Sequence, residues 1–278
     1  MKKNLTSHSI AFIFIALLSG STACNLSNNK ETQYNTANAD NNANTPELPN
    51  IPFSVVKTFP HDTSSFTQGL FIHNGKMYEG TGLEGRSKLM QVDINTGKAS
   101  KSHNLADEFF GEGIAVLNEV IYQLTWRNKV VFSYNINDFK PLQKFSIATE
   151  GWGITTDGQQ LIVSDGTSNL YFYEPETFAL TKQITVKDRG MLSPYLNELE
   201  YIDGYIYANK FMTPFILKID PQSGEVVGRM DLSSLWHQAR TKHPRADVPN
   251  GIAYDAETKK IYVTGKLWPE LYEIKIEG

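Results

Sequence analysis

Five stretches of the chain share the same alternation of apolar and polar positions. In each stretch a short apolar segment leads into a polar turn, and a second apolar segment follows, which is the pattern of a β-hairpin. Their starts are separated by roughly 40 to 53 residues, a spacing that predicts one repeated structural unit. The hairpins read GLFIHNGKMY from Gly69, GIAVLNEVIY from Gly113, GITTDGQQLIV from Gly153, ELEYIDGYIY from Glu198 and GIAYDAETKKIY from Gly251.

A third apolar strand follows every hairpin, and a fourth strand follows in four of the five repeats. The third strands read LMQVDI, VVFSYNI, LYFYEP, FILKID and LYEIKI, and the fourth read KSHNL, LQKFSI, LTKQITV and EVVGRMDL. Four antiparallel strands repeated around an axis form a β-propeller, which leaves only short, protected sheet edges. The pattern therefore predicts an all-β protein, a five-bladed β-propeller; an open β-solenoid or a sandwich is the alternative.

The two ends of the repeat region complement each other. The last repeat stops at LYEIKIEG and lacks its fourth strand, whereas a spare strand, FSVVKTF from Phe53, precedes the first repeat. We therefore expect Phe53–Phe59 to pair with the strand at Leu271–Ile276 and to close the last blade.

The N-terminal region carries a targeting signal. Lys2 and Lys3 precede a short apolar run, Ile10–Leu18, and small residues lead to Cys24, the only cysteine. This pattern predicts a signal peptide over residues 1–24, with Cys24 as the lipidated first residue of a mature lipoprotein. Ser21 stands where such sites usually carry Leu, so an ordinary cleaved signal peptide is the alternative. Either reading places the protein outside the cytoplasm, in the periplasm or cell envelope.

Composition divides the rest of the chain in two. Residues 25–50 are rich in Asn and Thr and poor in large apolar side chains, so they predict a disordered linker. Residues 51–278 form the propeller domain. The net charge of -4 and the lack of a basic cluster argue against nucleic-acid binding, and we expect a monomer that contacts the membrane through its lipid anchor.

Metal-dependent chemistry is not indicated by the sequence. The histidines are scattered, with none at ligand spacing from another, and a single cysteine forms no internal disulfide. We expect no required cofactor, although a structural calcium ion in the channel is left open. The histidines are His8, His61, His73, His103, His237 and His243.

Two sets of equivalent positions are expected to meet at one end of the central channel. The first strand of each blade lines the channel, and the second strand runs back to the same mouth. The positions entering the first strand are Gln68, Glu112, Trp152, Asn197 and Asn250, and those after the second strand are Gly82, Trp126, Gly166, Phe211 and Lys266. Polar, charged and aromatic side chains around a small opening are typical of a small-ligand site.

Taken singly, each of these residues also fits a structural role. Gln and Asn side chains often satisfy turns before a strand, the aromatic rings could fill blade cores, and Glu112 and Lys266 could form a structural ion pair. Their occurrence at equivalent positions of the repeats favours a site.

Several segments, in the same order and spacing, are similar to the plant and bacterial glutaminyl-peptide cyclotransferases. They are FTQGL, FGEGI, LTW, GWGIT, SDGTSNL, NELEYIDGYIYANKF, IDPQSGEVVGRMDL, NGIAYD and VTGKLWPELYEI. The resemblance runs from about Phe53 to the C-terminus. It implies a five-bladed propeller with an active site at the channel mouth, and an enzyme that converts the N-terminal glutamine of peptides to pyroglutamate with release of ammonia.

The resemblance also implies roles for individual residues. Glu112 of FGEGI and Lys266 of VTGK are the expected catalytic pair, with Glu112 shuttling a proton and Lys266 stabilising the oxyanion. Phe211 stands where the family usually has tryptophan. The expected substrate-binding residues are Phe66, Gln68, Phe110, Trp126, Trp152, Asn197 and Phe211.

Two other classes of function remain open on the sequence. One is a propeller that binds peptides or glycans without catalysis. The other is a propeller hydrolase or cofactor-dependent dehydrogenase, which would need a cluster of metal or cofactor ligands.

Overall fold

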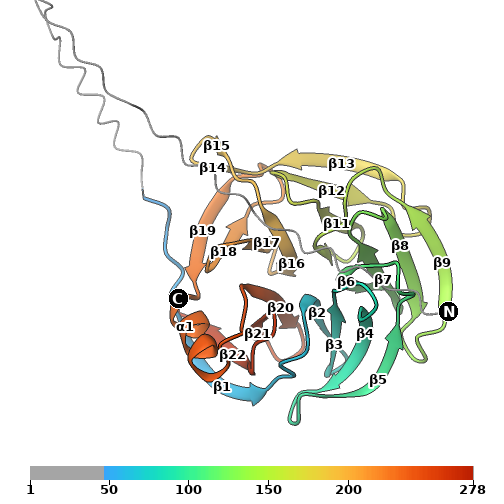
Figure 1. Cartoon of the computed structure of the whole chain (residues 1–278). Helices are drawn as coiled ribbons and strands as arrows, with labels where there is room; N and C mark the ends of the chain where they lie inside the picture. The colour runs from blue at the N-terminus through green and yellow to red at the C-terminus, as the bar shows by residue number, and fades with distance from the viewer. Residues whose placement is uncertain (1–46, 278) are drawn as a thin grey trace, which may run out of the picture. The chain divides into compact units, whose positions relative to one another are not determined.

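Each of the five predicted repeats forms a four-stranded antiparallel sheet, and the five sheets surround a central axis (Figure 1). The computed structural model describes residues 47–277. The first blade comprises β2 (Thr67–His73), β3 (Lys76–Thr81), β4 (Lys88–Asp93) and β5 (Lys98–Asn104), and the second β6 (Gly111–Leu117), β7 (Val120–Thr125), β8 (Val130–Asn135) and β9 (Pro141–Ser146). The third comprises β10 (Ile154–Thr156), β11 (Leu161–Ser164), β12 (Asn169–Tyr173) and β13 (Leu180–Thr185), and the fourth β16 (Leu196–Ile202), β17 (Tyr205–Lys210), β18 (Phe215–Ile219) and β19 (Val226–Asp231).

The fifth blade is built from both ends of the propeller sequence. It comprises β20 (Pro249–Asp255), β21 (Lys260–Gly265), β22 (Glu270–Ile276) and, on the outside, β1 (Phe53–Pro60). Strand β1 pairs antiparallel with β22, so that Phe53 lies opposite Ile276 and Phe59 opposite Leu271. The predicted closure by an N-terminal strand is thus confirmed.

The inner strands complete the ring. Strand β2 contacts β6 on one side and β20 on the other, and β10 and β16 continue the circle between them. Between neighbouring blades, the apolar faces pack together; Leu124 from the second blade, for example, shares a buried cluster with Ile154 and Val163 from the third. The predicted five-bladed propeller is confirmed.

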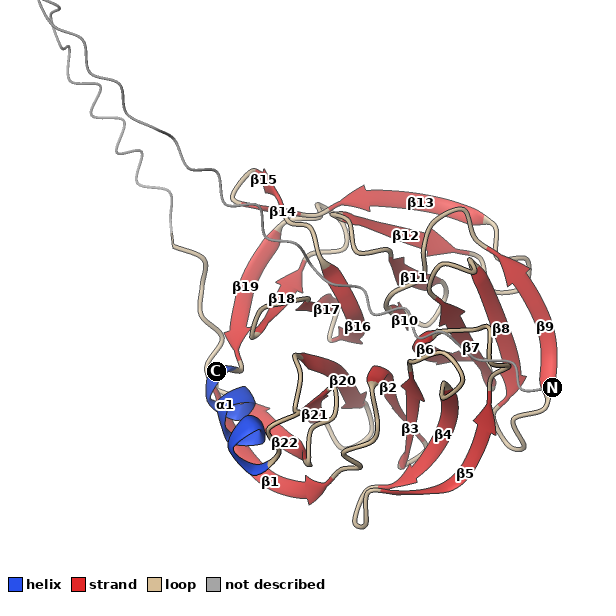
Figure 2. Cartoon of the chain, in the orientation of Figure 1, coloured by secondary structure: helices blue, strands red, loops and turns tan. Residues whose placement is uncertain are grey.

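Two small elements were not predicted from the repeat pattern. Strands β14 (Lys187–Asp188) and β15 (Met191–Leu192) form a short hairpin, and helix α1 (Ser233–Lys242) fills the long connection between β19 and β20 (Figure 2). Helix α1 buries Leu235 and Ala239, which lie one turn apart, in the same cluster as Trp268. This packing, rather than a strongly amphipathic pattern, explains the helix.

The predicted linker reaches too far into the structured region at its C-terminal end. Leu48 is buried against the fourth blade, and the backbone on either side of Asn50 bonds to β19: Arg229 N donates to Pro49 O at 2.9 Å and Ile51 N donates to Arg229 O at 2.7 Å. The Asn-rich composition of the predicted linker does not reveal that Leu48, a single large apolar residue near its end, packs into the core. The predicted signal peptide at 1–24, the predicted lipidation site Cys24 and most of the predicted linker lie outside the described residues.

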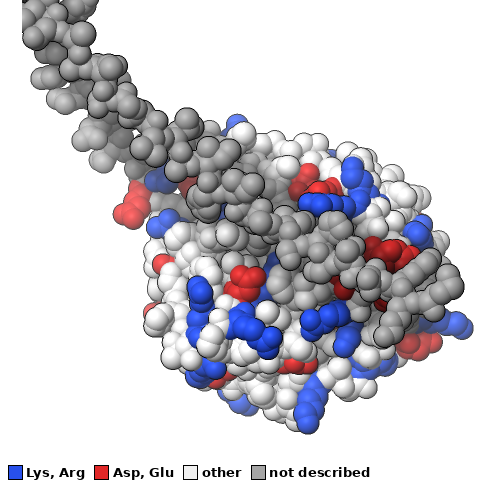
Figure 3. Space-filling view, viewed as in Figure 1, with Lys and Arg blue, Asp and Glu red and all other residues white. Residues whose placement is uncertain are grey.

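Basic and acidic side chains are interspersed over the visible surface of the propeller (Figure 3). Between residues 47 and 277, no helix has the length and hydrophobicity needed to cross a bilayer.

Candidate active site

A pocket of about 240 Å³ lies where the inner strands begin. All nine residues expected at the site line it, together with Leu83 and Asp247, which the sequence analysis did not identify. The lining residues are Phe66, Gln68, Leu83, Phe110, Glu112, Trp126, Trp152, Asn197, Phe211, Asp247 and Lys266. They come from all five blades, because the start of each inner strand and the end of its antiparallel neighbour share one edge.

Irregular pairing at the start of the inner strands explains how polar side chains reach the pocket. In four blades the register shifts at this point, and the shift contains Gln68, Glu112, Asn197 or Asn250. A β-bulge of this kind interrupts the ladder and redirects a side chain. Four of the five positions predicted to enter the first strand are therefore bulge positions, whereas Trp152 precedes the regularly paired β10.

Glu112 is buried in the pocket lining. Its neighbour Gly113 donates its N–H to Trp152 O at 2.8 Å, and a Cβ at Gly113 would lie only 2.8 Å from that oxygen. Glycine therefore lets two inner strands approach closely beside the carboxyl group. Burial raises the pKa of Glu112 well above its usual value; the positive charge of Lys266 opposes this rise and the negative charge of Glu150 adds to it.

Lys266 faces two aromatic rings. Its Nζ lies 4.8 Å from the ring centre of Phe66 and 5.2 Å from that of Phe211, distances at which a cation is attracted to a ring face. Burial lowers the Lys266 pKa, and the charges of Glu112 and Asp247 counteract this effect. A carboxyl group with a raised pKa and an ammonium with a lowered one thus share a single pocket, a pairing typical of catalytic sites.

The aromatic side chains form the pocket wall through edge-to-face contacts. Phe110 meets Trp126 at 5.5 Å between ring centres, and Trp152 meets Phe211 at 5.5 Å with an interplanar angle of 89°. Gly166 leaves room for this wall, because a Cβ there would lie 2.6 Å from the Trp152 ring. Gly82 leaves the same kind of room beside Phe110. Gly82 and Gly166, which occupy equivalent positions after the second strand of their blades, thus make space for the aromatic side chains.

Glu150 connects the two tryptophans. Its Oε2 accepts the indole N–H of Trp126 at 2.8 Å and that of Trp152 at 3.1 Å. The guanidinium carbon of Arg127 lies 3.9 Å from the ring centre of Trp126. Its Nε lies 3.9 Å from Glu150 Oε1. Glu150 was not predicted from the sequence, in which its only signal is an acidic residue two positions before Trp152.

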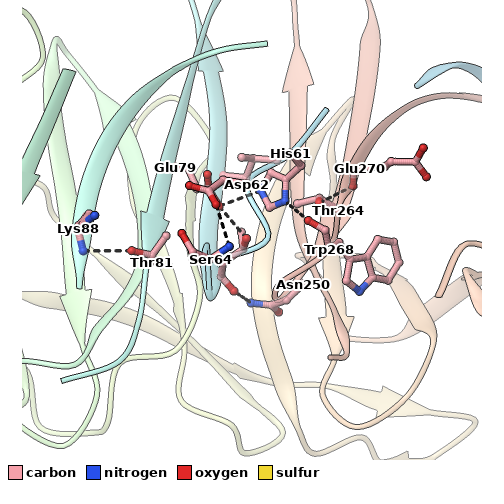
Figure 4. A network of polar contacts seen from close by, with 12 residues as sticks. His61, Asp62, Ser64, Glu79, Thr81, Lys88, Asn250, Thr264, Trp268 and Glu270 are labelled. Atoms are coloured by element: carbon pink, nitrogen blue, oxygen red, sulfur yellow. Dashed lines mark hydrogen bonds and ion pairs between the residues drawn. The ribbon is translucent and has the colours of Figure 1, made fainter. Parts of the chain in front are cut away.

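A buried polar network supports the turn that carries Lys266 (Figure 4). His61 donates from Nδ1 to Trp268 O at 2.8 Å, and its Nε2 lies 3.1 Å from Glu79 Oε1. Trp268 donates its indole N–H to Asp247 O at 2.8 Å. The network thus fixes the end of the Lys266 turn and the backbone of Asp247 at the pocket.

The described residues do not provide a metal centre. Within 47–277, no group of three or more His, Cys, Asp and Glu side chains is arranged to hold an ion. On the inner strand β16, Glu198 accepts N–H bonds from Leu70 and Ile252, and Glu200 accepts bonds from Tyr254 N and the Thr155 hydroxyl.

Comparison with known proteins matches the chain to one family along most of its length. The family model described as glutamine cyclotransferase matches residues 28–276. A glutaminyl-peptide cyclotransferase of Arabidopsis thaliana is 40% identical over 226 residues, which cover 80% of this chain and 71% of the relative. The crystal structure of Myxococcus xanthus glutaminyl cyclase superimposes with a TM-score of 0.78 at 36% identity, covering 83% of this chain and 99% of that one.

Proposed function

Because the chain belongs to the glutamine cyclotransferase family, we propose that it is a glutaminyl-peptide cyclotransferase. The enzyme converts the N-terminal glutamine of a peptide to pyroglutamate and releases ammonia, and in reaction class it is an aminoacyltransferase. The observation that carries the proposal is the placement of Glu112 and Lys266, with opposite pKa shifts, in one small aromatic pocket.

The reaction requires one proton to move from the attacking nitrogen to the leaving nitrogen. The substrate's α-amine attacks the carbon of its own γ-carboxamide, and Glu112 accepts the proton that the amine loses as the new C–N bond forms. Glu112 then gives this proton to the amide nitrogen, the old C–N bond breaks, and ammonia leaves. The carboxyl group returns to its starting state, so no external acid or base is consumed.

The remaining pocket residues bind and orient the substrate. Lys266 and the Gln68 amide stabilise the negative charge that develops on the carboxamide oxygen. Asn197 Oδ1 is buried without a partner among the described residues, so it is free to accept an N–H bond from the substrate. The rings of Trp126, Trp152 and Phe211 pack against the substrate methylenes and favour the folded conformation that ring closure needs.

Ammonia release from a peptide that begins with glutamine tests this function. We expect release from the free peptide and none from the same peptide with an acetylated α-amine, because the nucleophile is then blocked. Mass spectrometry of the product should show the loss of one ammonia and of the free N-terminus. Binding of the peptide without ammonia release would instead support a non-catalytic propeller.

We also propose that the enzyme acts as a monomer and without a metal ion. The five blades of a single propeller together supply the lining of the pocket. Light scattering should give the mass of a single chain, and dialysis against a chelator should leave ammonia release unchanged. A loss of activity that added calcium restores would contradict the metal-free mechanism.

Finally, we propose that the protein is exported and anchored in the cell envelope through lipidated Cys24. The support is the basic start, the short apolar run and the position of this single cysteine. Cys24→Ser should move the protein out of the membrane fraction or block its processing. Equal membrane association of both forms would contradict lipid anchoring and leave the proposed activity untouched.

A further inference from the structure

Asn250 is a buried residue behind the pocket that the mechanism above does not use. It lies at the bulge of β20, and its Nδ2 makes two hydrogen bonds: to Thr67 O at 3.0 Å and to Gln68 Oε1 at 3.2 Å. Asn250 does not line the pocket, whereas Gln68 does. Asn250 therefore contacts a substrate-binding side chain from behind.

The carbonyl of Thr67 settles which way both amides point. A backbone carbonyl only accepts hydrogen bonds, so the Asn250 atom facing Thr67 O must be the NH₂ nitrogen. The same nitrogen faces Gln68, so the Gln68 atom directed toward it must be the acceptor, Oε1. The NH₂ group of Gln68 is then left without a partner within residues 47–277, and it is the donor that Gln68 can offer to a ligand.

Other contacts hold Asn250 and Thr67 in place. Thr67 donates its hydroxyl at 2.7 Å to Oε1 of Glu79, which is labelled in Figure 4. Next to Asn250, Gly251 donates its N–H to Asn209 Oδ1 at 3.0 Å. The oxygen of Asn250 is buried without a partner in the described part of the chain. An unpaired buried acceptor is costly, so this arrangement keeps a donor toward Gln68 at the expense of stability.

We propose that Asn250 is a positioning residue, which orients the Gln68 amide so that its N–H groups point toward the carboxamide oxygen of the substrate. The inference rests on the proposed cyclotransferase function. In this arrangement Gln68 stabilises the developing oxyanion, and Asn250 acts only through Gln68. Without Asn250, the Gln68 amide turns freely and presents its oxygen as readily as its nitrogen.

A double-mutant cycle of Gln68→Ala and Asn250→Ala tests the proposal. Gln68→Ala should lower kcat by about 10²–10³-fold, the usual effect of losing one oxyanion donor. Asn250→Ala should lower kcat by about 10-fold, because a Gln68 amide that is free to rotate directs its N–H groups toward the substrate oxygen less often. The double variant should be within about 3-fold of Gln68→Ala alone, because Asn250 has nothing left to orient. Asn250→Asp, which replaces the donor nitrogen by oxygen, should lower kcat more than Asn250→Ala.

Ser133→Ala is the matched control for lost buried hydrogen bonds. Ser133 is as buried as Gln68, exchanges two hydrogen bonds with the Gln143 backbone, and does not line the pocket. This variant should lose stability and keep its kcat. A crystal structure of Asn250→Ala should show the Gln68 amide rotated, a readout that needs no activity.

The outcomes separate this inference from the function on which it rests. A wild-type protein that releases no ammonia would overturn the proposed function and the inference together. An active wild type whose two single-variant losses multiply in the double variant would overturn the inference alone. An Asn250→Ala variant with wild-type kcat, or with an unmoved Gln68 amide, would do the same.

Discussion

His61 and Glu79 form a buried pair in which Nε2 lies 3.1 Å from Oε1, with side-chain exposures of only 4% and 2%. The imidazole also donates from Nδ1 to Trp268 O, so a protonated ring would have an acceptor for each N–H. Burial by itself lowers the His61 pKa, but the charge of Glu79 and the two hydrogen bonds outweigh it, and the net shift is upward from 6.5.

This pair predicts that the stability of the propeller decreases as the pH rises. A histidine with a pKa raised by folding binds its proton more tightly in the folded state. Its stabilising contribution is complete below 6.5, the usual pKa, and is lost as the pH passes through the folded value. Urea unfolding should therefore show His61→Gln to be most destabilising in mild acid, with the difference from wild type shrinking above neutral pH. A difference independent of pH would rule out this linkage.

Glu112→Gln should abolish proton transfer and leave the fold intact. Glutamine keeps the size of the side chain but cannot accept the proton of the attacking amine, so kcat should decrease by about 10²–10⁴-fold. The unfolding midpoint should stay near that of wild type. Steady-state ammonia release and thermal unfolding measure the two effects.

Glu200→Gln is the control for Glu112→Gln. Glu200 is a half-buried glutamate with a raised pKa, but it does not line the pocket. Its variant should keep nearly all activity. If Glu112→Gln folds and keeps more than about a tenth of the wild-type kcat, another group moves the proton.

Glu200 itself predicts a second pH effect on stability. Burial raises its pKa from 4.5 to about 8, against the lowering effect of hydrogen bonds from Tyr254, Thr155 and Tyr201. The folded state therefore holds this proton more tightly than the unfolded state, and stability falls between pH 4.5 and about 8. Glu200→Gln removes the titrating group, so its stability relative to wild type should increase over this range. Parallel pH profiles of the unfolding free energy for the two proteins would contradict the prediction.

Phe211 is predicted to be a binding residue through its ring. It contacts Trp152 edge to face and lies under the Lys266 ammonium. Phe211→Ala should raise KM by about 10-fold, in line with the loss of a ring from a cation site, whereas Phe211→Trp should be tolerated. Phe211→Leu keeps apolar bulk without the ring face and should fall between them. Unchanged kinetics for Phe211→Ala would assign the side chain to blade packing.

Glu150 should influence the pH dependence of catalysis through its charge, without itself transferring a proton in the reaction. Its negative charge contributes to the raised pKa of Glu112, so Glu150→Gln should shift the rise of kcat/KM to lower pH. Glu150→Ala should show the same shift and, because both indole N–H bonds are lost, a higher KM and altered tryptophan fluorescence. A pH profile that does not move in Glu150→Gln would show that Glu150 only positions the indoles.

Most of the fold could be predicted from the repeat pattern, because the alternation of apolar and polar residues and the residue types at turns are local features of the sequence. The Asn74-Gly75 and Asp203-Gly204 turns mark hairpins without any knowledge of tertiary contacts. Helix α1 was missed because its formation depends on packing against the fifth blade.

Part of the site could be predicted from the sequence for the same reason. Gln68, Glu112 and Lys266 could be aligned as equivalent positions of a repeat, and the structure brings them to one pocket. Asp247 and Glu150 lie in connections that differ from blade to blade, so no repeat register points to them. The roles assigned to the pocket residues remain predictions.

The pairing of β1 with β22 also sets the order in which the protein can fold. Phe53 lies opposite Ile276, more than 200 residues further along the chain, so the ring stays open until the last strand has been synthesised. Contacts between such distant segments form slowly, since a long loop must close before they contribute. Until β22 has been made, β1 has no partner, and an unpaired edge strand favours aggregation. The synthesis of β22 thus determines when β1 is paired and the nearly complete propeller is protected from self-association.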